Sequence, residues 1–460
     1  MLLRRGCRGL LRRRRVERWM SSRDLVAESY AALEKVLDPV LGVDVVSSGL
    51  ATVDVDALKV SCDLDVGSAA HPGARVMAEG CSEALAKIKG FESVNVSATA
   101  SGFGLSASSS FRGLRDVRAV VAVSSAKGGV GKSTVAANLA RALSAKGGRV
   151  GLADLDVEGP SLPTLFGCPH ERLRPSPRSR GTGDDFLAMP VEKEGLKLAS
   201  VGFIDAPKDL AALRGPLAGR VASQVLTRTD WGSLDYLVLD FPPGIGDVAI
   251  TIARDATIHA NVVCSTPSLV SRADVKRGLP LFKQFHIPNI AFVDNMAYFK
   301  CPNCEEKHRI FGGVEEPSSS EKKNDAESKN DAVFELPLSL SVRDANEQRS
   351  LTGSFESLDL ESREAYLSLA SHVIDRLLRD GFRSRQKTID VSFDKKNLRI
   401  LLRTFDDQGA VSLSAPLASL RPGIPDTVLP TRLRVVAKRA VHVDWSDGRR
   451  NDVYALDRFS

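Results

Sequence analysis

The chain has 460 residues, which at roughly 100–200 residues per domain suggests about three domains. Hydrophobic residues make up 43% and charged residues 26%, a composition typical of a globular protein with well-filled cores. No stretch reaches the roughly 18 consecutive apolar residues of a membrane helix, so we expect no membrane span. Seven cysteines without a regular spacing exclude a disulfide scaffold and favour a reducing compartment.

The positive charge is concentrated at the N-terminus. Residues 1–22 hold eight arginines, no lysine and one acid, Glu17, so this segment has a charge of +7. The whole chain has a net charge of +6, and the other 438 residues therefore carry −1. Because the rest of the chain is nearly neutral, its charge gives no reason to expect binding to nucleic acid.

This Arg-rich, acid-poor segment is typical of an organelle import presequence, for the mitochondrial matrix first and the plastid stroma second. Arginines interrupt every candidate for the apolar core of about 7–15 residues that a secretory signal requires. A disordered basic arm that binds RNA or lipid is the alternative.

Residues 23–104 have the pattern of a small α+β domain. Apolar residues at helical spacing, followed by Asp38-Pro39, predict a first helix, and a second is ended by Gly90. A Ser/Gly-rich stretch at 101–110 predicts a linker, which we place at 105–115 as the boundary with the next domain. The predicted helices are Asp24–Leu37 and Arg75–Lys89, and the predicted strands are Leu50–Val55, Leu58–Val66 and Phe91–Ala98.

Residues 116–380 alternate short apolar strands with amphipathic helices. This alternation predicts an α/β domain whose mostly parallel, doubly wound sheet is covered on both faces. Two polar insertions, Cys168–Asp185 and Glu315–Asp331, have the composition of mobile surface loops. The predicted strands are Val117–Ser124, Arg149–Ala153, Leu196–Val201, Tyr236–Leu239, Ala260–Cys264 and Ile290–Val293, and the predicted helices are Lys132–Ala145, Pro216–Arg228, Ala273–Phe285 and Glu361–Leu378.

Residues 386–460 lose this alternation and predict a small, mostly β domain. Its predicted strands are Thr388–Phe393, Leu398–Thr404, Leu433–Ala437 and Ala440–Trp445, with a turn at Ser446-Asp447-Gly448.

The most specific motif is a phosphate-binding loop between the first predicted strand and helix of the α/β domain. Glycines let backbone N–H groups surround a phosphate, and the helix N-terminus adds positive potential. Lys132 is suited to the β- and γ-phosphates and the Ser133 hydroxyl to Mg²⁺, which makes the domain a P-loop NTPase. The loop runs Lys127, Gly128, Gly129, Val130, Gly131, Lys132, Ser133 and Thr134.

Acidic residues follow two strands of the same domain. Asp154 and Asp156 end one strand, and Asp240 ends another, so all three are expected at the carboxyl edge of the sheet, where ligands bind. Asp156 is suited to orient the attacking water, Asp154 to support the loop or the metal shell, and Asp240 to hold Mg²⁺. Gly244 is placed to offer its N–H to the γ-phosphate and so to distinguish ATP from ADP. Strand-end aspartates that only cap helices are the alternative.

A C-x₂-C pair, Cys301 and Cys304, follows the last predicted strand. It supplies two of the four thiolates of a cluster, and a symmetric dimer would supply four. The alternatives are half of a zinc site, with His308 nearby, a redox dithiol, and a chance occurrence of the pair.

Together these motifs resemble the Mrp/ApbC iron–sulfur cluster carrier ATPases, of the deviant Walker A group that includes MinD. The resemblance covers most of 116–350, and the order of domains is most like that of the organellar high-chlorophyll-fluorescence type. It is carried by Lys127–Thr134, Asp154–Pro163, Asp240–Asp247, Asn295–Tyr298 and Cys301–Cys304, with Asp38-Pro39, Gly42 and Gly49 in the N-terminal domain and Ala440–Gly448 in the C-terminal one.

The resemblance implies an ATP-hydrolysing homodimer in which Lys127 reaches the partner's nucleotide. It implies that Cys301 and Cys304 of two copies bind a [4Fe–4S] cluster, received from an upstream scaffold and passed to apoproteins. It further implies that Asn295 contacts the adenine base, and that the segment from Leu336 to Arg343 lines the same pocket.

One departure concerns the small domain, where the family carries a cysteine and this chain has His71. We expect His71 to be a solvent-exposed loop residue rather than an iron ligand. We expect Cys62, Cys81, Cys168 and Cys264 to be packing residues.

The sequence thus predicts an ATP-dependent iron–sulfur cluster carrier. A MinD/ParA-like positioning ATPase, which needs no cysteine pair, and a zinc-stabilised nucleotide-dependent scaffold are the alternatives. The C-terminus shows neither the amphipathic membrane helix nor the basic DNA-binding face expected of the positioning class.

Overall fold

The computed structural model describes residues 22–56, 59–100, 102–103, 105, 111–179, 186–204, 215–244, 246–311, 332–346, 355–386, 389–394, 399–406, 409–420, 428–436, 440–447 and 452–455. The predicted presequence, apart from Ser22, and the predicted loop Glu315–Asp331 lie outside these residues. None of the described helices is long and apolar enough to cross a bilayer.

The N-terminal residues form two helices against a three-stranded sheet in the order β1-β2-β3, with β1 antiparallel and β3 parallel to β2. The first helix ends four residues before the predicted Leu37, because the chain turns so that the Asp38 carboxylate accepts the N–H of Val40 at 2.7 Å. The elements are α1 (Ser22–Leu33), β1 (Ala51–Asp56), β2 (Lys59–Asp65), α2 (Ala74–Ala86) and β3 (Ser93–Thr99).

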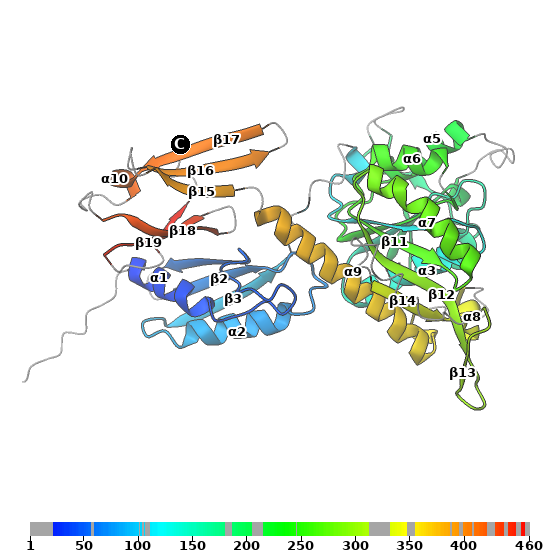
Figure 1. Ribbon diagram of the computed structural model, residues 1–460, viewed down its shortest axis with the longest axis horizontal. Helices are drawn as coiled ribbons and strands as arrows, with labels where there is room; N and C mark the ends of the chain where they lie inside the picture. The colour runs from blue at the N-terminus through cyan, green and yellow to red at the C-terminus, as the bar shows by residue number, and fades with distance from the viewer. Residues whose placement is uncertain are drawn as a thin grey trace, which may run out of the picture.

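A nine-stranded sheet forms the centre of the larger lobe (Figure 1). Its order is β13-β12-β11-β4-β10-β5-β9-β8, with β14 beside β12. Among the described strand pairs of this one sheet, only β12/β13 and β8/β9 are antiparallel. The mostly parallel α/β prediction is confirmed. The strands are β4 (Val120–Ser124), β5 (Val150–Asp154), β8 (Val191–Lys193), β9 (Leu196–Ser200), β10 (Tyr236–Asp240), β11 (Ala260–Ser265), β12 (Asn289–Lys300), β13 (Lys307–His308) and β14 (Ala332–Pro337).

Helices cover both faces of this sheet. Val121 and Val123 of β4 point into a core shared with α3 and α9, whereas Val120 and Ala122 point into a second core shared with α5 and α6. This two-residue alternation with apolar residues on both faces explains why the strands are apolar throughout. The helices are α3 (Lys132–Ala145), α4 (Leu162–Leu165), α5 (Gly215–Thr227), α6 (Asp247–Asp255), α7 (Leu269–Gln284), α8 (Leu340–Asn346) and α9 (Leu360–Gln386).

Several elements differ from the sequence prediction. Strand β12 continues seven residues beyond the predicted Val293, and its register shifts between Asp294 and Tyr298, where Met296 has a φ of 57°. The insertion predicted as a mobile loop is anchored in its described part. There β6 (Arg174–Pro175) pairs with β7 (Ala188–Met189), and the hydroxyl of Ser176 donates to Asp230 at 2.5 Å. Its last residues, 180–185, lie outside the described part of the chain.

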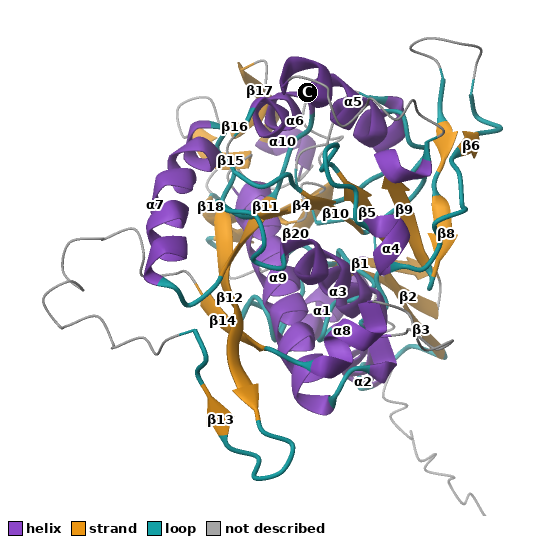
Figure 2. Cartoon of the chain, turned by 90° about the vertical axis from the view of Figure 1, so that its right-hand side faces the viewer, coloured by secondary structure: helices purple, strands orange, loops and turns teal. Residues whose placement is uncertain are grey.

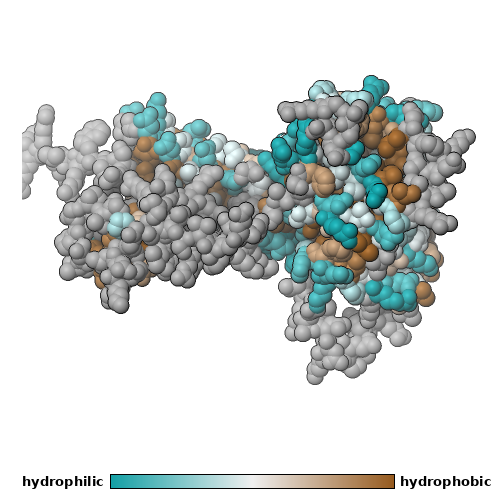
Figure 3. All heavy atoms as spheres, turned by 90° about the horizontal axis from the view of Figure 1, so that it is seen from above, coloured by the Kyte–Doolittle hydropathy of each residue, from teal (hydrophilic) through white to brown (hydrophobic). Residues whose placement is uncertain are grey.

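Helix α9 runs past the predicted end at Leu378 and connects the two lobes (Figure 1). Its Gly381 lies against the backbone of Phe103, so closely that a Cβ there would meet the Phe103 carbonyl. The Ser68 and Tyr236 hydroxyls are 2.7 Å apart and join the small N-terminal domain to β10. Seen from above, hydrophilic and hydrophobic side chains are intermixed over the described surface of the larger lobe (Figure 3).

The C-terminal residues form two antiparallel three-stranded sheets, β15-β16-β17 and β18-β19-β20. The two sheets share one core, so the mostly β prediction is confirmed here. The core contains Ile400, Ala415, Val441, Val443 and Trp445. The elements are β15 (Ile389–Asp394), β16 (Arg399–Asp406), β17 (Gly409–Pro416), α10 (Leu417–Leu420), β18 (Pro430–Val436), β19 (Ala440–Trp445) and β20 (Asp452–Ala455).

Candidate nucleotide site and cysteine hairpin

The phosphate loop connects the end of β4 with the start of α3, as its sequence predicts. Gly129 and Gly131 both have a φ of +80°, a left-handed conformation in which glycine is strongly favoured. A Cβ at Gly131 would lie 2.3 Å from the amide nitrogen of Asn295, so the strand behind the loop also requires glycine there. Gly128 and Lys127 are exposed, so the Lys127 side chain is free to extend away from its own loop.

The loop is held from behind by β12. The Asn295 side-chain amide donates to the carbonyl of Val130 at 2.9 Å, and both residues are buried. The resemblance assigns Asn295 to an adenine base, and one of the two N–H groups of its amide is engaged by the phosphate loop.

Lys132 and Asp240 form a buried ion pair at the base of the site. The ammonium also lies 3.3 Å from the hydroxyl of Ser133, on the first turn of α3 beside Thr134. Burial raises the pKa of Asp240 and the Lys132 charge opposes that shift. One buried oxygen of Asp240, Oδ2, has no hydrogen-bond partner among the described residues. A free carboxylate oxygen beside a serine hydroxyl is a donor set that suits Mg²⁺.

Asp154 is fully used within its own chain. Its carboxylate accepts the N–H groups of Asp156 at 3.1 Å, Ser161 at 2.8 Å and Leu162 at 3.2 Å, and the Ser200 hydroxyl at 3.1 Å. Asp154 therefore holds the segment after β5.

Asp156 is half-buried at the carboxyl edge of the sheet, where its carboxylate accepts the N–H of Gly159 at 3.2 Å.

Asp154 faces Asp240 across the neighbouring strands, and burial together with the charge of Asp240 raises the pKa of Asp154 to about 7.

Gly244 has a φ of +82°, and its N–H donates to the carbonyl of Ser125 at 2.9 Å. The N–H that the sequence assigns to a γ-phosphate is thus occupied by the start of the phosphate loop. Contact with a phosphate would require this hydrogen bond to break.

The cysteine pair lies in a hairpin between β12 and β13 that projects from the larger lobe (Figures 1 and 2). The Cys301 N–H donates to the Glu306 carbonyl at 3.0 Å, and the Glu305 N–H donates to the Cys301 carbonyl at 2.9 Å, which closes the turn. Cys301 is half-buried and Cys304 exposed. Backbone N–H groups of Cys304 and Asn303 and the Cys304 thiol lower the pKa of Cys301, which favours the metal-binding thiolate.

The base of the hairpin is clamped to α9. The Tyr298 hydroxyl donates to Glu361 at 2.8 Å, and the Lys307 ammonium lies 2.5 Å from the same carboxylate and 4.1 Å from the centre of the Tyr298 ring. This clamp has no sequence motif, because it joins residues far apart in the chain. Cys301 follows Asn295 by six positions along and just past β12, which at about 3.3 Å per residue places the phosphate loop within about 20 Å of the cysteines.

The prediction of an exposed His71 in the small domain is wrong. His71 is not solvent-exposed, since its side chain is 1% accessible and lies 3.3 Å from the equally buried Asp38 carboxylate. The loop after β2 packs against the larger lobe, which explains the burial. Cys62, Cys81, Cys168 and Cys264 are all buried, as predicted for packing residues.

Comparison with known families and proteins agrees with this arrangement. The model of the family described as "NUBPL iron-transfer P-loop NTPase" matches residues 116–374, more than half of the chain. The chain belongs to this iron-transfer P-loop NTPase family. Residues 28–98 match a second family, described as "Iron-sulfur cluster assembly protein".

Three relatives show how far the similarity extends. An iron–sulfur cluster carrier protein of Escherichia coli is 33% identical over 311 residues, 68% of this chain and 81% of that protein. One of Aquifex aeolicus is 48% identical over 198 residues, 43% of this chain and 52% of that protein. The chloroplastic Fe-S cluster assembly factor HCF101 of Oryza sativa is 38% identical over 283 residues, 61% of this chain. The chain spans about half the length of the last two, 52% of each.

Among solved structures, a nucleotide-binding protein from Archaeoglobus fulgidus in complex with ADP is 33% identical. It aligns over 51% of this chain and 88% of that one with a TM-score of 0.43.

Proposed function

We propose that this protein is an ATP-dependent carrier of iron–sulfur clusters. The observation that carries the proposal is the course of β12. The middle of this strand supports the phosphate loop through Asn295, and its C-terminal end continues into the projecting hairpin with Cys301 and Cys304. The two matching families and the names of the relatives favour a carrier over a MinD-like positioning ATPase.

The cargo is a [4Fe–4S] cluster. One copy supplies two thiolates, and a homodimer about a two-fold axis supplies the four that such a cluster takes. The projection of the hairpin supports this assignment, because a cluster at its tip is accessible to a donor and an acceptor. We propose that an upstream scaffold supplies the cluster and that apoproteins receive it.

The nucleotide is ATP with Mg²⁺. Ser133 and the free oxygen of Asp240 would hold the ion, which neutralises phosphate charge when bound. Lys132 stabilises the β- and γ-phosphates, the loop N–H groups from Gly128 to Lys132 surround them, and Asp156 orients the water that cleaves ATP to ADP and phosphate. Lys127 reaches the nucleotide of the second copy.

Gly244 would report the nucleotide. Its N–H has one hydrogen, which serves either the Ser125 carbonyl or a γ-phosphate. ATP but not ADP therefore breaks the bond to Ser125, and this rearrangement is our proposed origin of the change in dimer geometry that exposes or shields the cluster.

The organisation of the chain is part of the proposal. Residues 1–22 would be an import presequence, 23–104 a small family domain, 116–380 the ATPase and carrier domain, and 386–460 a C-terminal domain. The compartment would be an organelle, the mitochondrial matrix or alternatively the plastid stroma. The relatives include chloroplastic proteins, which supports an organelle.

Anaerobic reconstitution with iron and sulfide tests the function. The full chain should become brown and dimeric with four irons per dimer, and Cys301→Ser or Cys304→Ser should remove the colour. Asn303→Ala, between the two cysteines, is the matched control and should keep it. A colourless monomer that hydrolyses ATP would instead support the positioning class.

A further inference from the structure

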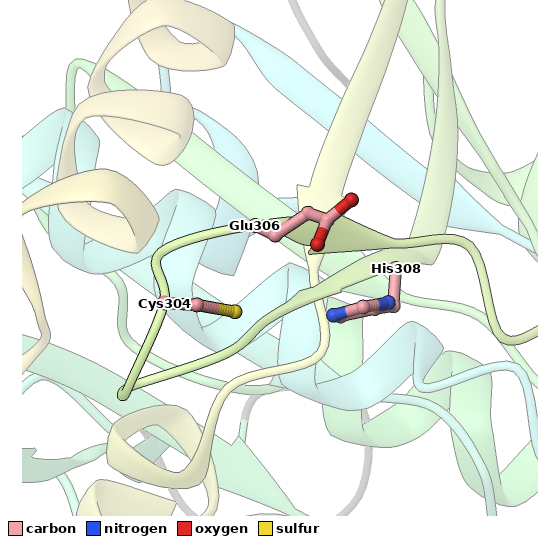
Figure 4. Close-up of side chains that lie close together, drawn as sticks. All are labelled: Cys304, Glu306 and His308. Atoms are coloured by element: carbon pink, nitrogen blue, oxygen red, sulfur yellow. The ribbon is translucent and has the colours of Figure 1, made fainter.

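The hairpin carries a second set of possible metal ligands. The ligand atoms of Cys304, Glu306 and His308 all lie within 4.8 Å of one another, and all three residues are exposed. Figure 4 shows the thiol of Cys304 and the imidazole of His308 directed toward each other, with the Glu306 carboxylate above them. Cys301 does not belong to this group.

Alternation along the extended residues that lead into β13 explains the grouping. Successive side chains of a strand point to opposite faces, so Glu306 and His308 share one face and Lys307 takes the other. Lys307 is held toward the protein by Glu361 and the ring of Tyr298. Glu306 and His308 are consequently turned outward, and the turn of the hairpin places Cys304 beside them.

Two of the three side chains, those of Glu306 and His308, have no competing contact. Within the part of the chain that the structure describes, neither the Glu306 carboxylate nor the His308 imidazole forms a hydrogen bond or an ion pair. The backbone of both residues is engaged: the Glu306 carbonyl accepts the N–H of Cys301, and His308 pairs with Phe299 of β12. By contrast, the neighbouring Lys307 forms an ion pair with Glu361. Glu306 and His308 are thus available to a ligand.

We propose that Cys304, Glu306 and His308 form a binding site for one divalent metal ion in a single chain. A thiolate, an imidazole and a carboxylate suit Zn²⁺ or Fe²⁺. In a tetrahedral site with bonds of 2.0–2.3 Å, ligand atoms lie roughly 3.5 Å apart, so rotation of exposed side chains is enough to close the set. Three protein ligands leave the fourth position to water.

Cys304 belongs to both ligand sets, which makes them mutually exclusive. The cluster takes Cys301 and Cys304 from two copies, whereas the single ion takes Cys304, Glu306 and His308 from one. A bound divalent ion therefore blocks cluster loading until it leaves. This consequence rests on the proposed function, whereas the metal site itself does not.

Equilibrium titration of the reduced, cluster-free full chain with Co²⁺ and Zn²⁺ tests the site. Co²⁺ should bind one per chain with a thiolate charge-transfer band, and Zn²⁺ should displace it. His308→Ala and Glu306→Gln should each weaken binding more than about tenfold, since even second-shell changes cost 10–100-fold. His170→Ala, an exposed histidine elsewhere, should leave the affinity unchanged. Circular dichroism spectra of all variants establish that they are folded.

The cysteine variants separate this site from the cluster. Cys301→Ser should lose the cluster and keep Co²⁺, His308→Ala should keep the cluster and bind Co²⁺ weakly, and Cys304→Ser should lose both. One metal per two chains, equal loss in Cys301→Ser and Cys304→Ser, or unchanged affinity in His308→Ala would overturn the proposal. If the parent protein binds Co²⁺ as expected but loads no cluster, the result would contradict the proposed function and leave the metal site standing.

Discussion

The amide of Asn295 donates to the carbonyl of Val130 at 2.9 Å, so the strand that leads to the cysteine hairpin is also the back wall of the phosphate loop. Gly131 lies so close to the same amide that no Cβ fits between them. We therefore expect a displacement of the loop to be transmitted to β12 through this contact.

Asn295→Leu should loosen this connection. The substitution leaves the buried Val130 carbonyl without its amide donor, at a cost of about 1–3 kcal/mol in unfolding free energy. ATP affinity should fall, and cluster release should lose its dependence on ATP while cluster binding persists. Calorimetric ATP titration and release assays measure both, and Asn303→Ala on the hairpin is the control. Retained ATP dependence of release would contradict transmission through this contact.

Lys132→Ala should abolish ATP hydrolysis and also destabilise the nucleotide-free protein. Its partner Asp240 is fully buried, and removal of one member of a buried pair typically costs about 3–5 kcal/mol. The double variant Lys132→Met/Asp240→Asn should recover most of that stability without activity. Urea unfolding and phosphate release distinguish the two effects; turnover in the double variant would refute both roles.

Asp359 should make the start of α9 sensitive to acid. Partial burial raises the pKa of Asp359. Hydrogen bonds to its carboxylate have the opposite and larger combined effect, so that the pKa falls from 3.8 to about 2. The donors are the hydroxyls of Ser339, Ser341 and Ser362 and the N–H of Ser362. Because the folded-state pKa is depressed, the stabilisation is present above pH about 4 and is lost as the pH falls toward 2. Asp359→Asn should be less stable than the parent at pH 7.

The difference in unfolding free energy between the parent and Asp359→Asn should shrink as the pH is lowered from 4 toward 2. Glu356→Gln, an exposed acid three residues earlier, serves as the control with no such trend. A constant difference between pH 7 and pH 3 would show that the serine cluster does not depend on the carboxylate charge.

Tyr236→Phe should weaken the attachment of the small N-terminal domain. The Tyr236 and Ser68 hydroxyls are buried and 2.7 Å apart, so loss of one is expected to cost about 1–2 kcal/mol. Ser68→Ala and the double variant complete a cycle whose coupling energy should be about 1 kcal/mol. Additive losses in that cycle would mean that the two hydroxyls act independently.

Local sequence patterns were enough to predict the class of fold and the position of the phosphate loop between β4 and α3. Both are local properties: apolar strands alternate with amphipathic helices, and Gly129 and Gly131 are needed for left-handed backbone whatever surrounds them. The length of α3 and the strands β4, β5 and β10 follow from the same local periodicity.

Contacts between residues far apart in the chain could not be predicted from such patterns. The contact of Asn295 with Val130, the clamp of Tyr298 and Lys307 on Glu361, and the burial of His71 beside Asp38 join residues distant in the chain. Even Cys304, Glu306 and His308, close in sequence, form a group only because pairing of β13 with β12 turns them to one face. Long-range packing has no period or motif, so sequence patterns do not reveal it.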